Sequence, residues 1–195
     1  MAFSVDQFRS ALMLDGARPN LFQIHLTFPP IVQNGSPREL TFLANGTQLP
    51  ASTVGVARQS YFGREVKFPG NRTFQDWSIN IINDETFDLR NAFEEWLNAI
   101  NGNETNVRDI QAIYSSDYSV RATVLQFSKS GNVIKAYNFE GLFPVQVDPI
   151  NLNWGTNDTI EEFGVTFSYQ YWTSDEGLDS ATPIASNYST ALLHS

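Results

Sequence analysis

Two histidines and several adjacent acidic pairs are among the side chains of this 195-residue sequence that could take part in acid–base or metal chemistry. His25 lies on the polar side of an alternating apolar–polar stretch, and His194 lies near the end of the chain. Neither has the HExxH spacing or another arrangement of metal ligands around it. The chain has no cysteine, which excludes disulfides, thiolate nucleophiles and cysteine-based zinc sites. We therefore expect no bound metal and no cofactor.

Three of the acidic pairs that could suggest paired carboxylates are Asp84-Glu85, Glu94-Glu95 and Glu161-Glu162. A glycosidase needs two carboxyl groups that face each other across a sugar, usually from different elements. Neighbouring residues of a strand point to opposite faces, so a pair within one strand cannot do this alone. The sequence also lacks the G-x-S-x-G, P-loop and G-x-G-x-x-G patterns of nucleophilic and nucleotide-binding sites. We predict that the protein is not an enzyme, with no catalytic residue and no small-molecule ligand.

Four of the twelve Lys and Arg residues fall within 15 residues of a chain whose net charge is −9. So few cations do not suit a protein that grips nucleic acid, because phosphate neutralisation by cations supplies most of that affinity. The cationic cluster has two interpretations: a solvated hairpin, or a patch that binds an acidic surface on another copy of the protein. On the second, the residues predicted to contact another copy are Arg58, Tyr61, Arg64, Lys67, Pro69 and Arg72.

One long amphipathic helix is predicted to begin after Asp84, which can act as its N-cap, and to end at Asn101-Gly102. Glu85 and Asp88 lie near the positive end of the predicted helix dipole. Apolar residues then recur at spacings of three and four, which is the pattern of one buried helix face. We predict that the helix docks on the core through Leu89, Phe93, Trp96, Leu97 and Ile100, with Ala92 between them.

Alternating apolar and polar residues, separated by Gly, Pro and Asn, predict strands through most of the remaining chain. Pro69-Gly70-Asn71 and Ser130-Gly131-Asn132 are the strongest turn signals. Many strands and one helix favour a mainly β fold, with two packed antiparallel sheets forming a sandwich or barrel and the helix on one side. The expected strands are Leu21–Phe28, Glu39–Leu43, Ala57–Phe62, Arg64–Phe68, Trp77–Ile81, Tyr118–Phe127, Val133–Phe139, Val145–Leu152 and Ile160–Trp172.

The length favours a single domain over residues 1–195. Residues 1–20 are expected to form an N-terminal arm, because Gly16 and Pro19 interrupt any longer helix. Residues 174–195 are polar and rich in Ser and Thr, and are expected to form a C-terminal arm or tail. We expect no signal peptide, and no stretch approaches the roughly 20 apolar residues of a membrane span.

Three stretches resemble the tail tube family of contractile-tailed bacteriophages: residues 20–29 (NLFQIHLTFP), 49–100 and 149–174. Together they cover most of the chain in the order of that family. The middle stretch is the most specific, through Phe68-Pro69-Gly70, Arg72-Thr73-Phe74, Asn83-Asp84 and Trp96.

The resemblance implies two roughly orthogonal antiparallel sheets and subunits that form hexameric rings, which stack into a tube. It implies partners: other copies of the chain, the tail sheath protein, baseplate and tail terminator proteins, and a tape-measure protein in the lumen. DNA would pass through the tube without specific binding. The protein would be part of the virion tail, after assembly in the cytoplasm of the bacterial host. The ring protein of type VI secretion and phage-tail-like bacteriocin tubes share the fold.

The lumen of such a tube is predicted to be acidic or neutral, because a wall without cations cannot hold phosphates. Glu161 and Glu162 are the lumen candidates, and only one of them can face the lumen because neighbours on a strand point to opposite faces. Two alternatives stay open. One is the tube of a DNA-free contractile injection system or bacteriocin. The other is a carbohydrate-binding β-sandwich module, which exposed Trp and Tyr on a strand face would favour. The alternating aromatics Phe163, Phe167, Tyr169 and Tyr171 are instead interpreted as core or ring interface.

Overall fold

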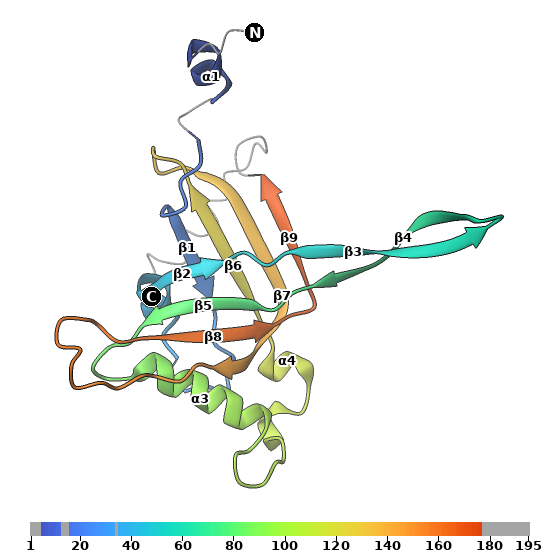
Figure 1. Ribbon diagram of the computed structural model, residues 1–195. Coiled ribbons are helices and arrows are strands. Elements are labelled where there is room, and N and C mark those ends of the chain that lie inside the picture. Colours follow the sequence, from blue (N-terminus) through green and yellow to red (C-terminus); the bar gives the residue numbers. More distant parts are fainter. Residues whose placement is uncertain (1–4, 13–15, 34, 177–195) are drawn as a thin grey trace.

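The computed structural model describes residues 5–12, 16–33 and 35–176 (Figure 1). Two antiparallel sheets share one long strand, β7 (Val133–Val147), in the strand order β1-β6-β7-β8-β5-β2, with β9 also paired to β7. The first sheet contains β1 (Phe22–Leu26), β6 (Val120–Phe127) and β9 (Tyr171–Glu176). The second contains β2 (Ala44–Gln48), β5 (Trp77–Ile82) and β8 (Glu162–Ser168). Figure 1 shows the strands of one sheet crossing those of the other, which confirms the predicted mainly β, antiparallel fold class.

Strand β7 changes partner along its length, which joins the two sheets. Residues 135–140 pair with β9, and residues 143–147 pair with β8. Between them Gly141 has a φ of +66°, and a Cβ there would lie 2.8 Å from Cγ of Gln170. The predicted single strand Ile160–Trp172 is therefore wrong, because Tyr169 and Gln170 interrupt it opposite Gly141. The predicted strands Val133–Phe139 and Val145–Leu152 are instead one strand that ends at Val147.

Aromatic side chains fill the core between the sheets. The ring of Trp77 on β5 stacks on Phe139 of β7 with centroids 4.5 Å apart, and its Nε1 donates to Oγ1 of Thr47 at 2.7 Å. Phe163 and Phe167 point inward from β8 at every second position, as strand alternation requires. Tyr169 is buried as well, whereas Tyr171 lies on β9 and is half exposed. Three of the four alternating aromatics interpreted as core or ring interface are thus core residues.

Helix α3 (Asp88–Ile100) packs beneath the second sheet (Figure 1). Its buried face contains Leu89, Phe93 and Trp96, while Leu97 and Ile100 are half-buried. The predicted N-cap is wrong, because the helix begins four residues after Asp84, at a cap formed by Phe87 in the left-handed conformation. The Asp84 carboxylate accepts a hydrogen bond from the Thr86 hydroxyl at 2.7 Å, within a turn that precedes the helix.

The predicted strand Glu39–Leu43 is a helix, α2 (Pro37–Leu43). Ser36 caps it, with its Oγ accepting from the backbone N–H of Glu39 at 3.3 Å, and Pro37 occupies the first turn. A serine cap followed by proline is a strong local start signal, and it overrides the apolar alternation of Leu40 and Phe42. Strand β2 follows the helix directly, so the chain still reaches the sheet edge.

The ends of the chain differ in how much of them is described. Helix α1 (Val5–Ala11) lies in the predicted N-terminal arm and stands away from the sheets in Figure 1, with Val5 and Phe8 exposed. The predicted C-terminal arm is wrong over residues 174–176, because they belong to β9. The rest of that arm lies outside the described residues. A short 3-10 helix (Ile110–Ala112) and α4 (Ser115–Tyr118) connect α3 to β6. No helix in the described ranges is long and apolar enough to cross a membrane.

Candidate functional site: a projecting hairpin

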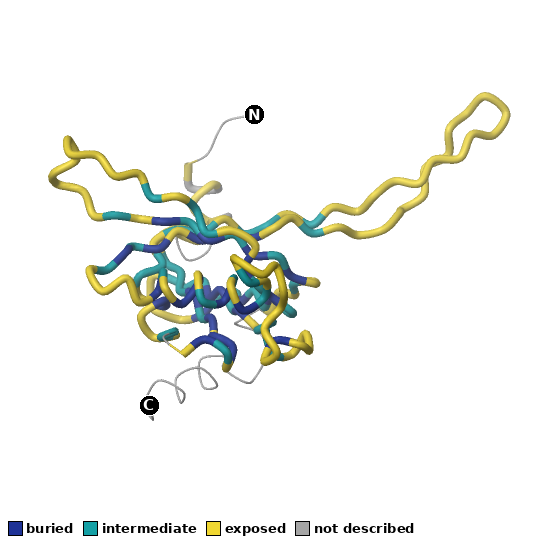
Figure 2. The backbone as a smooth tube through the Cα atoms, turned by 90° about the horizontal axis from the view of Figure 1, so that it is seen from below, coloured by how far each residue is buried: buried dark blue, intermediate teal, exposed yellow. Residues whose placement is uncertain are grey.

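Strands β3 (Ser52–Tyr61) and β4 (Arg64–Phe74) form a separate two-stranded sheet that extends away from the body (Figures 1 and 2). Every residue from 53 to 73 is exposed. The turn lies at Phe62-Gly63, where both residues have positive φ. The cationic cluster predicted from the sequence therefore sits on a long exposed hairpin.

The predicted turn at Pro69-Gly70-Asn71 is wrong, because these residues lie inside β4. The pairing shifts between Val54 and Val56, as at a β-bulge, and Gly55 lies there against Gly70. A Cβ on Gly70 would lie 3.0 Å from the Gly55 carbonyl oxygen. Glycine thus permits a close backbone approach at a bulge, rather than a reversal of the chain.

Beyond the bulge the hairpin has two different faces. Cross-strand partners share a face, and the pairs Ala57–Phe68, Gln59–Val66 and Tyr61–Arg64 make one of them mostly apolar. We call Ala57, Tyr61, Val66 and Phe68 the apolar face. The pairs Arg58–Lys67 and Ser60–Glu65 lie on the other, charged face together with Pro69.

The structure therefore separates the residues predicted to contact another copy. Arg58 and Lys67 lie opposite each other, and Arg58 also forms an exposed ion pair with Glu65 at 3.4 Å. Tyr61 and Arg64 lie at the tip on the opposite face, and Arg72 pairs with Val54 on the body side of the bulge. The predicted strands contain all four residues of the apolar face, but the cross-strand register that places them on one face was not predicted. The alternation from Ala57 to Tyr61 is the signal that could have found it.

The base of the hairpin is clamped to the body by Tyr169. Its hydroxyl donates to the Gln75 carbonyl at 2.6 Å, and the Gln75 N–H donates to the Ala51 carbonyl at 3.3 Å. Burial, with a smaller contribution from nearby Asp76, raises the pKa of Tyr169 to about 12, so the phenol stays a neutral donor. The rings of Phe74 and Trp172 lie 6.4 Å apart beside the same junction.

Tyr169→Phe should destabilise the folded protein by roughly 1–2 kcal/mol, because the Gln75 carbonyl loses its side-chain donor while the ring packing is kept. Denaturant unfolding followed by circular dichroism measures this. Tyr171→Phe is the matched control, since Tyr171 is half exposed, and it should change the unfolding free energy by less than about 0.5 kcal/mol. Equal effects of the two changes would contradict the clamp.

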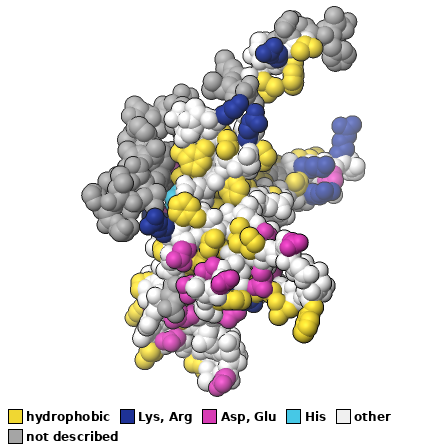
Figure 3. Space-filling view, turned by 90° about the vertical axis from the view of Figure 1, so that its left-hand side faces the viewer, with side chains coloured by type: hydrophobic (Ala, Val, Ile, Leu, Met, Phe, Trp, Pro, Cys, Tyr) yellow, Lys and Arg dark blue, Asp and Glu magenta, His cyan; other side chains and the backbone are white. Residues whose placement is uncertain are grey.

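The two lumen candidates lie at the start of β8, at the other end of the molecule. Glu161 is half-buried and accepts from the side-chain amide of Asn83, whose backbone N–H also donates to the Glu161 carbonyl at 2.8 Å. Glu162 is exposed and accepts from the amide of Asn45 at 2.6 Å. Figure 3 shows acidic side chains gathered over the lower body, where α3 lies. The role of either glutamate in a lumen remains a prediction.

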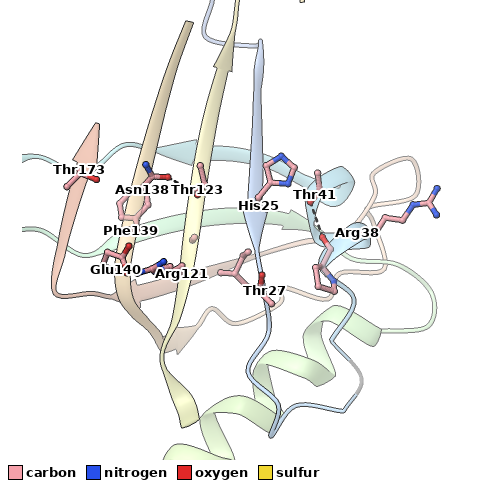
Figure 4. Close-up of a pocket in the computed structure, with 13 residues that line it drawn as sticks. His25, Thr27, Arg38, Thr41, Arg121, Thr123, Asn138, Phe139, Glu140 and Thr173 are labelled. Carbon is pink, nitrogen blue, oxygen red and sulfur yellow. Dashed lines mark hydrogen bonds and ion pairs between the residues drawn. The ribbon is translucent and has the colours of Figure 1, made fainter. Parts of the chain in front are cut away.

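A hollow of about 760 Å³ lies between α2 and the first sheet (Figure 4). The cross-strand row His25, Thr123, Asn138 and Thr173 runs along it. Thr123 Oγ1 donates to Asn138 Oδ1 at 2.9 Å, and Asn138 Nδ2 donates to Asp175 at 2.8 Å. Burial lowers the pKa of His25, which favours the neutral imidazole. Within residues 5–12, 16–33 and 35–176, no three His, Cys, Asp or Glu side chains come together as a metal site.

A family model described as phage tail tube protein matches residues 17–175. The chain belongs to the phage tail tube protein family. The tail tube protein of Enterobacteria phage T4 is 34% identical over 161 residues, which are 81% of this chain and 91% of the relative. The tail tube protein of Serratia phage KSP90 is 28% identical over 176 residues, 88% of this chain and 97% of the relative.

Solved structures with the same fold come from contractile assemblies. A chain of the anti-feeding prophage baseplate aligns with a TM-score of 0.62 at 10% identity, over 83% of this chain and 96% of that one. A chain of the sheath–tube complex of the extracellular contractile injection system PVC aligns with a TM-score of 0.55 at 15% identity, over 90% and 99%. At sequence identities this low, the structural similarity shows only that the fold is shared. Family membership confirms the resemblance and the tail tube function, and it favours a phage tail tube protein over the carbohydrate-binding module.

Proposed function

We propose that this tail tube protein forms hexameric rings that stack into the inner tube of a contractile phage tail. The observation that carries the proposal is the β3–β4 hairpin, which projects from the body with an apolar face in solvent. An isolated two-stranded hairpin is at best marginally stable in water, so a partner surface is needed to order it. A protein whose relatives form tubes has other copies of itself as the nearest such surface.

Charge supports contact between the hairpin and a neighbouring copy in the adjacent ring. Four cations and one acid lie between Ser52 and Phe74, which gives the hairpin a charge of +3. Because the whole chain has a net charge of −9, the residues outside the hairpin carry a net charge of −12. Opposite fields favour encounter between the hairpin of one copy and the body of another. Such a contact between stacked rings is heterologous and does not close on itself, so it repeats along the axis and builds a filament.

The partners of the tube follow from the same proposal. Outside it lies a tail sheath protein, at its ends lie baseplate and tail terminator proteins, and inside it lies a tape-measure protein during assembly. Rings assemble in the cytoplasm of the bacterial host, and the finished tube is part of the virion tail. The sheath–tube and baseplate assemblies that contain chains of this fold support the contacts with sheath and baseplate.

The lumen wall lets DNA slide through the tube because it does not bind the phosphates. Six copies would carry a charge of −54, and charge on an inner wall lies closer to passing DNA than charge on the outer wall. Acidic or neutral residues, with Glu161 or Glu162 among them, would let phosphates pass without being held. A tube structure with a lumen lined mainly by Lys and Arg would overturn this sliding mechanism.

Electron microscopy of the purified protein tests the assembly. The wild type should form rings or tubes. A shortened variant, in which Asn-Gly replaces residues 57–68, keeps the bulge and the Tyr169 clamp and should stay monomeric with an unchanged circular dichroism spectrum. Wild-type protein that remains monomeric at every concentration would contradict the proposal, as would a shortened variant that forms normal tubes.

A further inference from the structure

The tip of the hairpin has an aromatic residue where the backbone favours Asn or Gly. Phe62 has a φ of 47° and Gly63 a φ of 77°, so both turn residues are left-handed. A two-residue turn with positive φ at both positions prefers Asn-Gly, Asp-Gly or Gly-Gly. The left-handed region is unfavourable for a residue with a Cβ, so phenylalanine is a poor choice for the turn itself.

The Phe62 side chain makes few contacts within its own chain that could offset this unfavourable backbone conformation. It is 90% exposed, and its ring lies against the ring of the neighbouring Tyr61, with 4.6 Å between the centroids. Tyr61 is also largely exposed. An aromatic pair at the end of an extended arm, held in an unfavourable conformation, is suited to insertion into another surface.

A complementary surface lies on the loop between β7 and β8, residues 148–161. Leu152 is 84% exposed, Ile160 is 72% exposed, and Trp154 is fully exposed. A hollow of about 280 Å³ lies within the loop, between Pro149–Asn153 and Thr159–Glu162. The backbone N–H groups of Gly155 and Thr156 donate to Oδ1 and the carbonyl of Asn153 at 2.9 and 3.1 Å, which shapes the loop around Trp154.

The walls of this hollow are partly apolar and partly acidic. Leu152 and Ile160 supply apolar surface, while Glu161 and Glu162 also line the hollow and Asp158 belongs to the same loop. The hairpin tip has a matching composition, because Arg64 lies opposite Tyr61 on the same face, two residues after Phe62. Apolar area and opposite charge therefore meet if the two surfaces join.

We propose that Tyr61 and Phe62 of one copy insert into the β7–β8 loop of a second copy, with Arg64 against whichever of Glu161 and Glu162 does not face the lumen. The inference rests on the proposed self-assembly and names the surface that receives the hairpin. Tip and loop extend to opposite sides of the protomer in Figures 1 and 2, so they cannot meet within one chain. They can meet between copies, and because the two surfaces differ, the contact repeats as a head-to-tail assembly does.

Cross-linking tests the contact directly, because the chain has no cysteine of its own. Phe62→Cys combined with Ile160→Cys should give a ladder of covalent oligomers when assembled protein reacts with a short bismaleimide linker. The control combines Phe62→Cys with Val107→Cys, which is also exposed but lies after α3, and it should give no ladder. Tubes that form without a 62–160 cross-link would reject this contact and leave the proposed function standing. Absence of rings or tubes in the wild type would instead reject the proposed function.

Phe62→Asn separates assembly from folding. Asparagine suits the turn, so the melting temperature of the monomer should be unchanged or higher. The protein concentration needed for tube formation should rise about tenfold or more, because an aromatic anchor is lost from each contact. Trp154→Ser should act in the same way, whereas Ile110→Ser, at an exposed apolar residue elsewhere, should not. A Phe62→Asn protein that builds tubes at the wild-type concentration would overturn the proposal. A defect seen only when a sheath protein is added would then place the contact of Phe62 on the sheath.

Discussion

Replacing Trp96 by alanine should lower the free energy of unfolding by roughly 3–5 kcal/mol. Trp96 is fully buried on α3, and its ring lies among Phe28, Phe93 and Phe167 at centroid distances of 6.0 to 6.4 Å. Its Nε1 also donates to the Tyr118 carbonyl at 2.8 Å, which ties the helix to the segment before β6. The substitution removes the largest side chain of the helix face and leaves that carbonyl without its donor.

Trp154→Ala is the matched control, because it removes the same side chain from a fully exposed position. It should change the unfolding free energy by less than about 0.5 kcal/mol. Both changes should be measured by urea unfolding in the shortened-hairpin variant, so that assembly does not add to stability. A Trp96→Ala protein as stable as the Trp154→Ala protein would show that the α3 face does not hold the fold together.

Reversing two hairpin charges should disrupt stacking while leaving the protomer folded. Arg64→Glu with Lys67→Glu changes the hairpin charge from +3 to −1, and both side chains are exposed. Like charges would then meet the acidic body of the neighbouring copy, so tubes should be shorter or absent at physiological salt. Added salt should weaken wild-type stacking but partly restore the variant, because screening reduces attraction and repulsion alike.

Arg38→Glu with Lys129→Glu makes the same change in net charge at two exposed cations outside the hairpin. Tube length measured by electron microscopy at several salt concentrations should separate the two variants. If both pairs of substitutions shorten the tubes equally, net charge and not the hairpin controls stacking. If the Arg64 and Lys67 variant matches the wild type in length and salt resistance, the electrostatic contribution is absent.

Local periodicity determined those elements whose burial pattern repeats within a few residues. The α3 face from Leu89 to Trp96 and the alternation of β5 and β8 could be predicted because side-chain direction has a fixed period in a helix or strand. The family resemblance, the absence of cysteine and the cationic cluster are also visible in the sequence alone. These features of the sequence alone indicate a structural tube protein.

Tertiary structure decided the features that depend on residues far apart in the chain. Pro69-Gly70 has turn chemistry, but pairing with Val56 and the approach to Gly55 keep it in a strand. β7 is shared by two sheets because β8 and β9 pair with its two halves, and every residue in these pairs lies at least 18 residues from its partner in sequence. The distance of the hairpin from the body, its two unlike faces, and the position of the Trp154 loop at the opposite end also follow from this pairing. Local propensity cannot encode them, because strand pairing is an interaction between segments and not a property of one segment.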